Sequence, residues 1–489
     1  MTDTLSLTPQ EAVEALSALY EEACEAQRGA LARYLATREP PPASLRARFR
    51  YPELRLTYAP GSGRLAPNFR AYAKFTAPGA YTVSVTQPDA FRAYLIDQLA
   101  PLAAEYGARI EVARSDQEIP YPYVLRAGDD LVANTTVGVT PADLARHFPV
   151  PLLSLVGDEV PDGEWRPAPG EPLPLALFDA VRTDYSLRRL VHYTGTDWRD
   201  FQPWILLTNY HRYVDQFVRY GLQALRQGGP YTALSAAGGA RVEAGEVDEG
   251  SAARVLAAPW HRHQMPAYHL HAGDGQGVTL VNIGVGPSNA KTITDHLAVL
   301  RPHAWIMIGH CGGLRGSQSI GDYVLAHAYL RDDKILDAAL PPEIPVPALA
   351  EIQVALQEAA AHVTGDDGEV LKSRLRTGTV VTTDDRNWEL RWSKERRRFN
   401  LSRAVAIDME SGTVAAQGYR LRVPYGTLLC VSDKPLHGEL KLPGAANAFY
   451  ERAVGEHLLI GIETIERLKR GGPTIHSRKL RSFDEPPFR

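Results

Sequence analysis

Apolar positions recur with a helical period over residues 8–38, which predicts a long amphipathic helix near the start of the chain. Its first residues, Thr8-Pro9-Gln10-Glu11, place proline at the first helical position and an acid in the first turn. Short strand patterns follow at residues 54–58 and 81–86, and a second helix is predicted at about residues 88–106. Together these elements predict a small α+β domain.

The pattern changes after residue 230, where near-continuous apolar strands alternate with helices. One strand is predicted at residues 278–283, followed by a glycine-containing turn and a helix that extends to residue 300. Another is predicted at residues 304–308 and leads into a glycine-rich turn at residues 309–313. This alternation indicates an α/β domain in which helices flank a mostly parallel or mixed sheet.

A passage rich in proline and glycine, residues 161–174, separates the two patterns and predicts a linker. Residues 175–230 are expected to be largely helical. A chain of 489 residues is too long for one ordinary core. We therefore predict an N-terminal α+β domain with its linker at residues 1–175 and an α/β domain at residues 176–489.

Two apolar runs in the second domain end in carboxylates, the first in Asp408-Met409-Glu410 and the second in Ser432-Asp433. An open α/β sheet binds its ligands at the carboxyl ends of its strands, so we expect Asp408, Glu410 and Asp433 at one site. Paired carboxylates suit cleavage of a glycosidic bond, because one protonates the leaving group while others hold the sugar as positive charge develops. Taken singly, an acidic residue at such a position is more often a helix cap or a turn residue, but the coincidence of all three with the motifs below favours a site.

Composition narrows the class of protein. The formal net charge is −4 and 44% of the residues are hydrophobic, which argues against a nucleic-acid-coating protein and against disorder. The cysteines are far apart in sequence and form neither a CxxC pair nor a disulfide framework. The N-terminus does not resemble a signal peptide, and no uncharged run is long enough to cross a membrane. We expect a soluble, cytoplasmic protein with no nucleic-acid or membrane partner.

Two other patterns carry weaker chemical meaning. Gly284-Val285-Gly286 follows a predicted strand, but Asn289 stands where a dinucleotide-binding turn needs its third glycine. Glycine at this turn more plausibly lets the backbone approach a sugar or a phosphate. The histidine-rich residues 261–271 invite a zinc interpretation, but the spacing of known zinc sites is absent, and we expect no metal site.

Longer runs carry a resemblance to a known family. The order and spacing of the nucleoside phosphorylase/nucleosidase superfamily are matched by Gly309-His310-Cys311-Gly312-Gly313-Leu314, Asp408-Met409-Glu410-Ser411 and Val431-Ser432-Asp433. More narrowly, the chain resembles the bacterial AMP nucleosidases at residues 209–215, 282–291, 382–390, 434–439 and 485–489. The similarity is dense from about residue 190 to the end and thinner before that.

The resemblance implies hydrolysis of the N-glycosidic bond of AMP to adenine and ribose 5-phosphate, which would regulate intracellular AMP. It also implies a catalytic domain of the nucleoside phosphorylase type and a homohexamer. No cofactor is required for the chemistry in this family. The resemblance further implies that the N-terminal domain responds to MgATP as an allosteric activator and to inorganic phosphate as an inhibitor.

The resemblance also assigns roles to individual residues. Asp433 corresponds to the aspartate that protonates or hydrogen-bonds N7 of the purine, and burial beside an apolar strand would favour its protonated form. Glu410 would hold the ribose hydroxyls, where hydrogen bonds strengthen as the oxocarbenium ion forms. Met409 would pack under the sugar. The expected substrate-binding residues also include Gly286, His310, Gly312 and Asn387.

Two positions favour water over phosphate as the nucleophile. Phosphorylases hold the attacking phosphate with an arginine and a serine, and the corresponding positions here are Met307 and His310. Related nucleosidases activate the water with a glutamate in an early loop, and residues 235–239 offer no carboxylate at the matching place. Either Asp408 or Glu410 is left as the base, and the choice between them stays open.

A phosphorylated sugar needs a cation at the site. The candidates are Lys434, Arg386 and Lys441. Trp388, which follows Arg386 closely, is expected either to stack on adenine or to lie in the core. In the N-terminal domain, an effector phosphate could be bound near a glycine turn by Arg64, Arg70 and Lys74.

Two other functions are compatible with parts of the pattern. A phosphorolytic transferase acting on purine nucleosides would form ribose 1-phosphate, and Met307 in place of an arginine counts against it. A nucleotide-sensing module that had lost catalysis would lack a carboxylate, whereas Asp433 and Glu410 are both present. The sequence therefore favours a hydrolase.

Overall fold

The structure is a computed structural model that describes residues 6–59, 71–125, 138–439, 447–471, 475 and 480–489. The chain divides into two compact units, Met1–Arg188 with Arg481–Arg489, and Arg189–Leu480. We predicted the boundary near residue 175, and the two units divide at residue 188. The C-terminal segment, which we assigned to the second domain, lies in the first unit.

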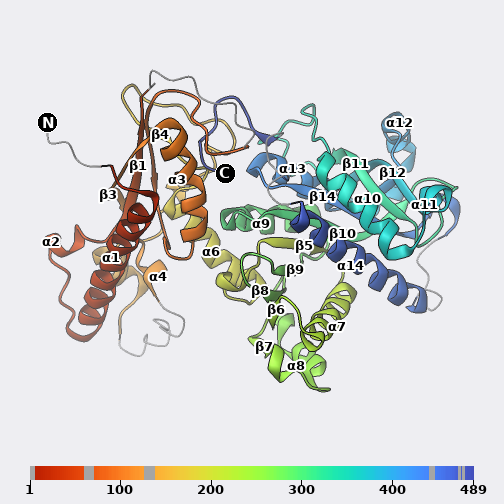
Figure 1. Cartoon of the computed structure of the whole chain (residues 1–489), viewed down its shortest axis with the longest axis horizontal. Coiled ribbons are helices and arrows are strands. Elements are labelled where there is room, and N and C mark those ends of the chain that lie inside the picture. Colours follow the sequence, from red (N-terminus) through yellow and green to blue (C-terminus); the bar gives the residue numbers. More distant parts are fainter. Residues whose placement is uncertain (1–5, 60–70, 126–137, 440–446, 472–474, 476–479) are drawn as a thin grey trace. The chain divides into compact units, whose positions relative to one another are not determined.

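The first unit is built on a four-stranded sheet in the order β3-β1-β2-β4. Figure 1 labels β1, β3 and β4 of this sheet. β1 pairs antiparallel with β2 and β3, and β2 pairs parallel with β4. The strands are β1 (Arg50–Tyr58), β2 (Gly79–Ser84), β3 (Arg109–Glu118) and β4 (Leu173–Pro174). The helices are α1 (Pro9–Thr37), α2 (Ala43–Arg46), α3 (Arg92–Tyr106), α4 (Tyr121–Val124) and α5 (Pro141–His147).

Helix α1 confirms the prediction for residues 8–38. A capping box joins Thr8 and Glu11, so that each side chain satisfies the backbone N–H of the other residue. Leu16 of this helix packs into an apolar core with Leu54 of β1 and Leu99 of α3. Helices packed against a mostly antiparallel sheet in this way confirm the α+β fold predicted for this part of the chain.

The C-terminal segment joins the first unit through both packing and hydrogen bonds. Phe488 is buried in that core, and its N–H donates to the carbonyl oxygen of Leu175 at 3.1 Å. The N–H of Ala73 donates to the carbonyl oxygen of Pro487 at 2.7 Å, and the Tyr94 hydroxyl donates to that of Arg489 at 2.8 Å. These partners are distant in sequence, so a reading by position alone assigned the segment to the wrong domain.

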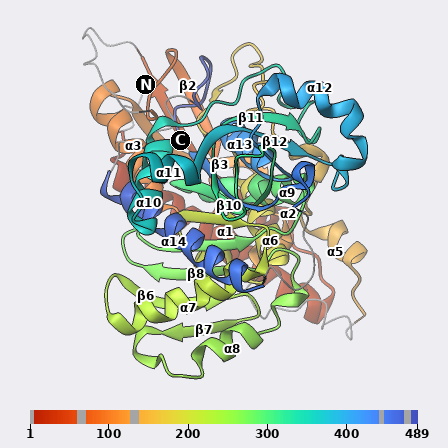
Figure 2. The same ribbon diagram turned by 90° about the vertical axis from the view of Figure 1, so that its right-hand side faces the viewer.

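The second unit contains a ten-stranded mixed sheet in the order β13-β12-β11-β14-β10-β5-β9-β8-β6-β7. Its strands are β5 (Trp204–Thr208), β6 (Tyr231–Ala236), β7 (Ala240–Glu243), β8 (Ala267–Ala272), β9 (Val278–Asn282), β10 (Ala304–Gly313), β11 (Tyr323–Asp332), β12 (Leu375–Thr383), β13 (Ala406–Asp408) and β14 (Tyr425–Asp433). Because β13 also pairs with β10, a closed ring is formed by strands β13, β12, β11, β14 and β10. Figure 2 shows β6, β7 and β8 side by side, and these strands run antiparallel.

Helices cover both faces of this sheet, as the continuous apolar strands predicted. The helices are α6 (Ala180–Thr194), which starts in the first unit, α7 (His211–Gln227), α8 (Ser251–Ala257), α9 (Pro287–Leu297), α10 (Ala350–Thr364), α11 (Gly368–Arg374), α12 (Trp392–Ser402), α13 (Ser411–Leu421) and α14 (Asn447–Arg470). Successive residues of a strand point to opposite faces. On β10, the Trp305 indole donates a hydrogen bond to the Val414 carbonyl oxygen of α13, which covers one face. The next residue, Ile306, lies near Gly426 on the opposite face, which α10 covers.

Two segments differ from the prediction. Strand β5 occupies the centre of the sheet within a region predicted to be largely helical, because its five residues are buried and the first four of them are apolar. The glycine-rich residues 309–313 continue β10 instead of forming a turn. Glycine is needed there because a Cβ atom would lie 3.2 Å from Ile407 at Gly312 and 2.9 Å from Val431 at Gly313.

No helix in the described ranges is both long and apolar enough to span a membrane.

Candidate active site

The three predicted carboxylates share one cavity of about 240 Å³ in the second unit. Asp408 ends β13, Glu410 directly precedes α13, and Asp433 ends β14. Four other predicted residues line the same cavity, namely Met409, His310, Gly312 and Arg386. The strand ends therefore gather these side chains as the sequence pattern predicted.

Three helices begin beside this cavity. α7 begins at His211, α9 at Pro287 and α13 at Ser411, and in each case a residue just before the helix lines the cavity. The N-terminus of a helix presents unpaired backbone N–H groups and the positive end of the helix dipole. The cavity is therefore suited to anionic groups, whether they belong to the protein or to a ligand.

Glu410 is 1% exposed and is held by two N–H donors. The Asn209 side-chain amide donates to its Oε2 at 2.8 Å, and the backbone N–H of Gly286 donates to its Oε1 at 2.6 Å. Burial raises the pKa of Glu410, and the nearby carboxylate of Asp408 raises it further, while the two hydrogen bonds act in the opposite direction. The donors fix the orientation of the carboxylate at the wall of the cavity.

Asp408 has both a structural role and a place in the cavity. Its Oδ1 accepts a hydrogen bond from the Thr382 hydroxyl at 2.6 Å, and its Oδ2 accepts one from the backbone N–H of Ser411 at 2.8 Å. The second bond satisfies an N–H at the start of α13, so the helix-cap explanation holds for this residue. Burial raises the pKa of Asp408 above its usual range.

Asp433 is half-buried at the end of β14. The Ser432 hydroxyl donates to its Oδ1 at 2.6 Å and also lies 3.2 Å from the carbonyl oxygen of Cys311 on β10. Both Ser432 and Asp433 line the cavity. The side chain of Asp433 is thus anchored from one side and open to the cavity on the other.

Three predicted substrate-binding residues do not line the cavity. Lys434 directly follows Asp433, but its side chain does not line the cavity. Its ammonium is buried, donates to the Gln318 carbonyl at 2.7 Å and pairs with Glu439 at 2.6 Å. Gly286 acts through its backbone N–H on Glu410, and the Asn387 N–H donates to Asp385 in its own loop.

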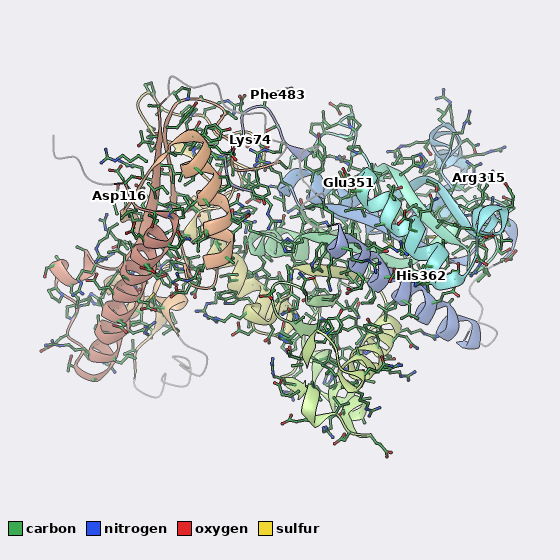
Figure 3. The ribbon with its side chains drawn as sticks, viewed as in Figure 1. Lys74, Asp116, Arg315, Glu351, His362 and Phe483 are labelled. Carbon is green, nitrogen blue, oxygen red and sulfur yellow. The ribbon has the colours of Figure 1, made fainter. Side chains whose placement is uncertain are left out.

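The remaining candidate cations are unequally placed. Arg386 is exposed at the cavity, and within the described residues its guanidinium makes no hydrogen bond or ion pair. Lys441, Arg64 and Arg70 lie outside the described residues. Lys74 is half-buried in the first unit and is labelled in Figure 3. Its role in effector binding stays a prediction.

The structure adds lining residues that sequence reasoning did not assign to the site. Asn209, Tyr210 and Glu389 are the chemically important ones. Trp388, which we expected either to stack on adenine or to lie in the core, lines the cavity and is also packed in a small core. Asn209 follows an apolar strand and precedes a helix, which is the same position that marked the carboxylates. That shared position was the signal that could have identified it.

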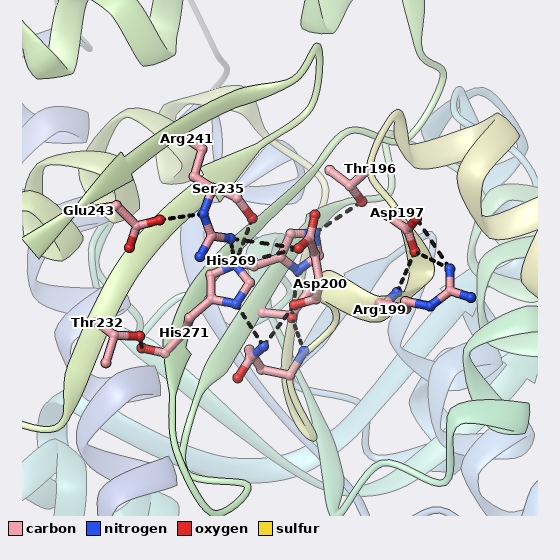
Figure 4. Close-up of polar contacts among 12 residues, drawn as sticks. Thr196, Asp197, Arg199, Asp200, Thr232, Ser235, Arg241, Glu243, His269 and His271 are labelled. Carbon is pink, nitrogen blue, oxygen red and sulfur yellow. Dashed lines mark hydrogen bonds and ion pairs between the residues drawn. The ribbon is translucent and has the colours of Figure 1, made fainter. Parts of the chain in front are cut away.

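The histidines of β8 form a hydrogen-bonded network (Figure 4). His269 is fully buried, with Nδ1 2.9 Å from the Thr279 hydroxyl and Nε2 3.0 Å from the Thr196 hydroxyl. The Nε2 of His271 lies 2.7 Å from the Ser235 hydroxyl. Burial lowers the pKa of both imidazoles, to about 4 in His271. Among the described residues no cluster of three or more metal-ligating side chains is found.

Comparisons with known proteins cover both units. The family described as bacterial AMP nucleoside phosphorylase N-terminus matches residues 11–172, and the phosphorylase superfamily matches residues 244–464. AMP nucleosidase of Escherichia coli (strain K12) is 58% identical over 486 residues, which are 99% of each chain. A solved structure, AMP nucleosidase from Bacteroides thetaiotaomicron, aligns at 27% identity and a TM-score of 0.43 over 59% of this chain and 98% of that chain.

Proposed function

Because this chain belongs to the AMP nucleosidase family within the phosphorylase superfamily, we propose that it hydrolyses the N-glycosidic bond of AMP. The products are adenine and ribose 5-phosphate, and the reaction regulates intracellular AMP. The observation that carries the proposal is the cavity in which Asp408, Glu410 and Asp433 stand together at strand ends. This arrangement supplies the carboxylates that cleavage of a glycosidic bond requires.

Asp433 is the proposed general acid. It lines the cavity, and the hydroxyl of Ser432 donates to its Oδ1, which orients the carboxyl at the wall of the cavity. Transfer of its proton to N7 turns adenine into a neutral leaving group as the bond to the sugar breaks. Because Asp433 lines the cavity, its carboxyl can contact a bound purine there.

Glu410 is the proposed clamp on the ribose hydroxyls. Its two anchors, the Asn209 amide and the Gly286 N–H, can only donate, so they stabilise the ionised carboxylate. A fixed negative charge beside the sugar stabilises the positive charge of the oxocarbenium ion. Met409, which lines the cavity between the two carboxylates, offers an apolar surface beneath the sugar.

Arg386 is the proposed ligand of the 5′-phosphate. Among the described residues it is the one lysine or arginine side chain that lines the cavity. An arginine fork binds phosphate oxygens in pairs, and the nearby helix N-termini add backbone N–H groups of the same polarity. His310 and Gly312 line the remaining wall of strand β10.

Water is the proposed nucleophile. A phosphorolytic enzyme has to hold a second phosphate beside the sugar, and Met307, at the position where phosphorylases carry an arginine, is fully buried in the apolar core. The single arginine at the cavity is already assigned to the 5′-phosphate of the substrate. Hydrolysis of a nucleotide therefore fits the charges present better than phosphorolysis of a nucleoside.

We extend the proposal to regulation and assembly, which rest on the family resemblance. MgATP is the proposed activator and phosphate the proposed inhibitor of a cytoplasmic homohexamer, both acting through the first unit. All lining residues of the cavity belong to the second unit, so the first unit is available for another task. Sedimentation analysis tests the hexamer, and AMP hydrolysis with and without MgATP or phosphate tests the regulation.

The decisive experiment is incubation of the pure protein with AMP in buffer free of phosphate, with free adenine measured over time. We expect adenine and ribose 5-phosphate in equal amounts. Asp433→Asn keeps the shape of the side chain, removes the proton that reaches N7, and should lower kcat about 10³-fold. Absence of adenine with the wild-type protein, or ribose 1-phosphate formed only when phosphate is added, contradicts the proposed function.

A further inference from the structure

One imidazole lies in the cavity together with the three carboxylates. His310 is buried on β10 and lines the cavity. Its ring packs against two tyrosine rings, with centroids 4.8 Å from Tyr210 and 5.6 Å from Tyr213. The imidazole is therefore confined between aromatic surfaces at the place where the reaction has to occur.

The surface beneath His310 is itself fixed. Tyr213 is fully buried, and its hydroxyl donates to Nδ1 of His457 at 2.7 Å. The other nitrogen of His457 donates to the carbonyl oxygen of Leu428 on β14 at 3.0 Å. Burial lowers the pKa of His457 to about 3, so that imidazole is neutral and has one donor and one acceptor, as both bonds require. This chain of contacts holds the Tyr213 ring, and with it the orientation of His310.

The carboxylates of the cavity already have other partners. Both oxygens of Asp408 accept hydrogen bonds, from Thr382 and Ser411, and both oxygens of Glu410 accept N–H donors. Asp433 is assigned to the purine. A water that attacks the sugar must still lose a proton, and a neutral imidazole has a basicity well matched to neutral pH.

We propose that His310 is the general base that activates the attacking water, an assignment that rests on the proposed function. The water oxygen bonds to C1′ of the ribose as the bond from C1′ to N9 of adenine breaks, and the electron pair of the broken bond stays on adenine. The proton of the water passes to an imidazole nitrogen of His310, while Asp433 gives its proton to N7. Exchange of one proton each with solvent then restores His310 and Asp433, so water is the one co-reactant.

Several ionisable groups share the environment of His310 and bear on its titration. The charged side chains that line the cavity are Arg386, Glu389, Asp408, Glu410 and Asp433. The aromatic rings packed on the imidazole add the hydroxyl groups of Tyr210 and Tyr213. Each of these groups is retained in the variants below, so a change in the pH profile reports on the imidazole.

The test compares His310→Gln and His310→Ala with the wild-type protein. We expect kcat for AMP hydrolysis at neutral pH to fall about 10²- to 10³-fold in both variants, with KM changed by less than about threefold. Added imidazole should restore part of the rate in His310→Ala, because it can occupy the space left by the side chain. The acid limb of the pH profile of kcat/KM that comes from imidazole protonation should disappear.

His327→Gln is the matched control, because His327 is an exposed histidine on the neighbouring part of the same sheet, away from the cavity. Its kcat should equal that of the wild-type protein. Circular dichroism and AMP binding by calorimetry establish that the His310 variants are folded and bind substrate.

Two outcomes overturn the assignment of His310 and leave the proposed function standing. The first is a wild-type protein that releases adenine together with a His310→Gln variant whose kcat is within about threefold of it. The second is a loss of rate that is equal at every pH and is not restored by imidazole, which indicates a structural role. A wild-type protein that releases no adenine from AMP instead contradicts the proposed function itself.

Discussion

Asp184 in the first unit and Glu410 in the second are both buried carboxylates that accept two hydrogen bonds. Asp184 accepts from the Tyr51 hydroxyl at 2.6 Å and the Thr86 hydroxyl at 2.8 Å. Glu410 accepts from two N–H groups and lines the cavity of the second unit, whereas Asp184 is not among the residues that line this cavity. Burial raises the pKa of both, so an upward shift of the pKa does not by itself identify an active site.

The chemical nature of the donors separates the two sites. A hydroxyl can donate or accept, so the neighbours of Asp184 tolerate either protonation state of its carboxyl. The amide of Asn209 and the backbone N–H of Gly286 can only donate, so they favour an ionised Glu410. We infer that Asp184 joins elements of its unit together, whereas Glu410 holds a charge ready for a substrate.

Of the variants that test this comparison, Glu410→Gln gives the largest expected effect, because it removes the charge that stabilises the oxocarbenium ion while keeping the size of the side chain. We expect kcat for AMP to fall about 10²- to 10³-fold. Steady-state assays of adenine release measure the effect, and thermal unfolding followed by circular dichroism shows whether the fold is intact. A variant that unfolds at a much lower temperature, but retains its kcat, would place Glu410 in the same structural class as Asp184.

Asp184→Asn should change the pH dependence of stability and leave kcat unchanged. Burial raises the pKa of Asp184 from 3.8 to about 6 in the folded protein, so between these pH values the folded state keeps a proton that the unfolded state has lost. The free energy of unfolding therefore falls as the pH rises through this window, by at most about 3 kcal/mol. The asparagine variant lacks this contribution.

Urea unfolding of the Asp184→Asn and wild-type proteins at several pH values between about 4 and 7 measures the difference. The free energies of unfolding should diverge as the pH rises through this window, because the wild-type protein loses stability and the variant does not. The same slope in both proteins would show that another group is responsible. A large loss of kcat in the variant would remove the contrast with Glu410.

Arg386→Gln should weaken AMP binding without affecting a substrate that lacks the phosphate. The loss of a charge-assisted interaction is worth about 1.5–3 kcal/mol, so KM for AMP should rise about 10- to 100-fold, and the smaller value is expected for an exposed side chain. Adenosine provides the comparison, since its KM should not change.

Lys334→Gln is the matched control for Arg386, because Lys334 pairs with Asp384 in the same loop at 2.9 Å and is similarly exposed. An exposed ion pair of this kind contributes little, so its variant should bind AMP normally. An equal rise of KM for AMP in both variants would mean that the charge of the loop, and not Arg386 itself, attracts the phosphate.

The parts of the fold that depend on local pattern could be predicted from sequence. The capped helix α1 and the strands β9 and β10 follow from apolar periodicity, and the carboxylates of the site follow apolar strands. The place of Phe488 in the first unit depends on contacts across most of the chain, which no local pattern encodes. The central position of β5 likewise depends on pairing with strands that come much later.

Within the site, the residues that form the cavity were easier to predict than the residues that support it. Lys434 was assigned to the site because it adjoins Asp433, but its ammonium donates to the carbonyl oxygen of Gln318 instead. Asn209 reaches Glu410 across 201 positions of sequence, so no spacing rule could pair them. Supporting contacts of this kind become visible only in the folded structure.

Asn209→Ala should have the smallest of these effects, because Gly286 still holds the other oxygen of Glu410. The loss of one hydrogen bond to a charged group should lower kcat about tenfold. Gly309→Ala tests the same support from the neighbouring strand, since a Cβ atom there would lie 2.8 Å from Oδ1 of Asn209 and should displace its amide. The Gly309→Ala variant is expected to lose kcat to a similar degree.

A double-mutant cycle decides whether the two substitutions act through one contact. If Gly309→Ala acts by displacing the Asn209 amide, it should cost little more once that amide has been removed, so the double variant should resemble Asn209→Ala. Additive losses of kcat would show that Gly309 acts by another route. A double variant with the kcat of the wild-type protein would show that Glu410 needs no amide at all, and would remove the distinction between its N–H donors and the hydroxyls around Asp184.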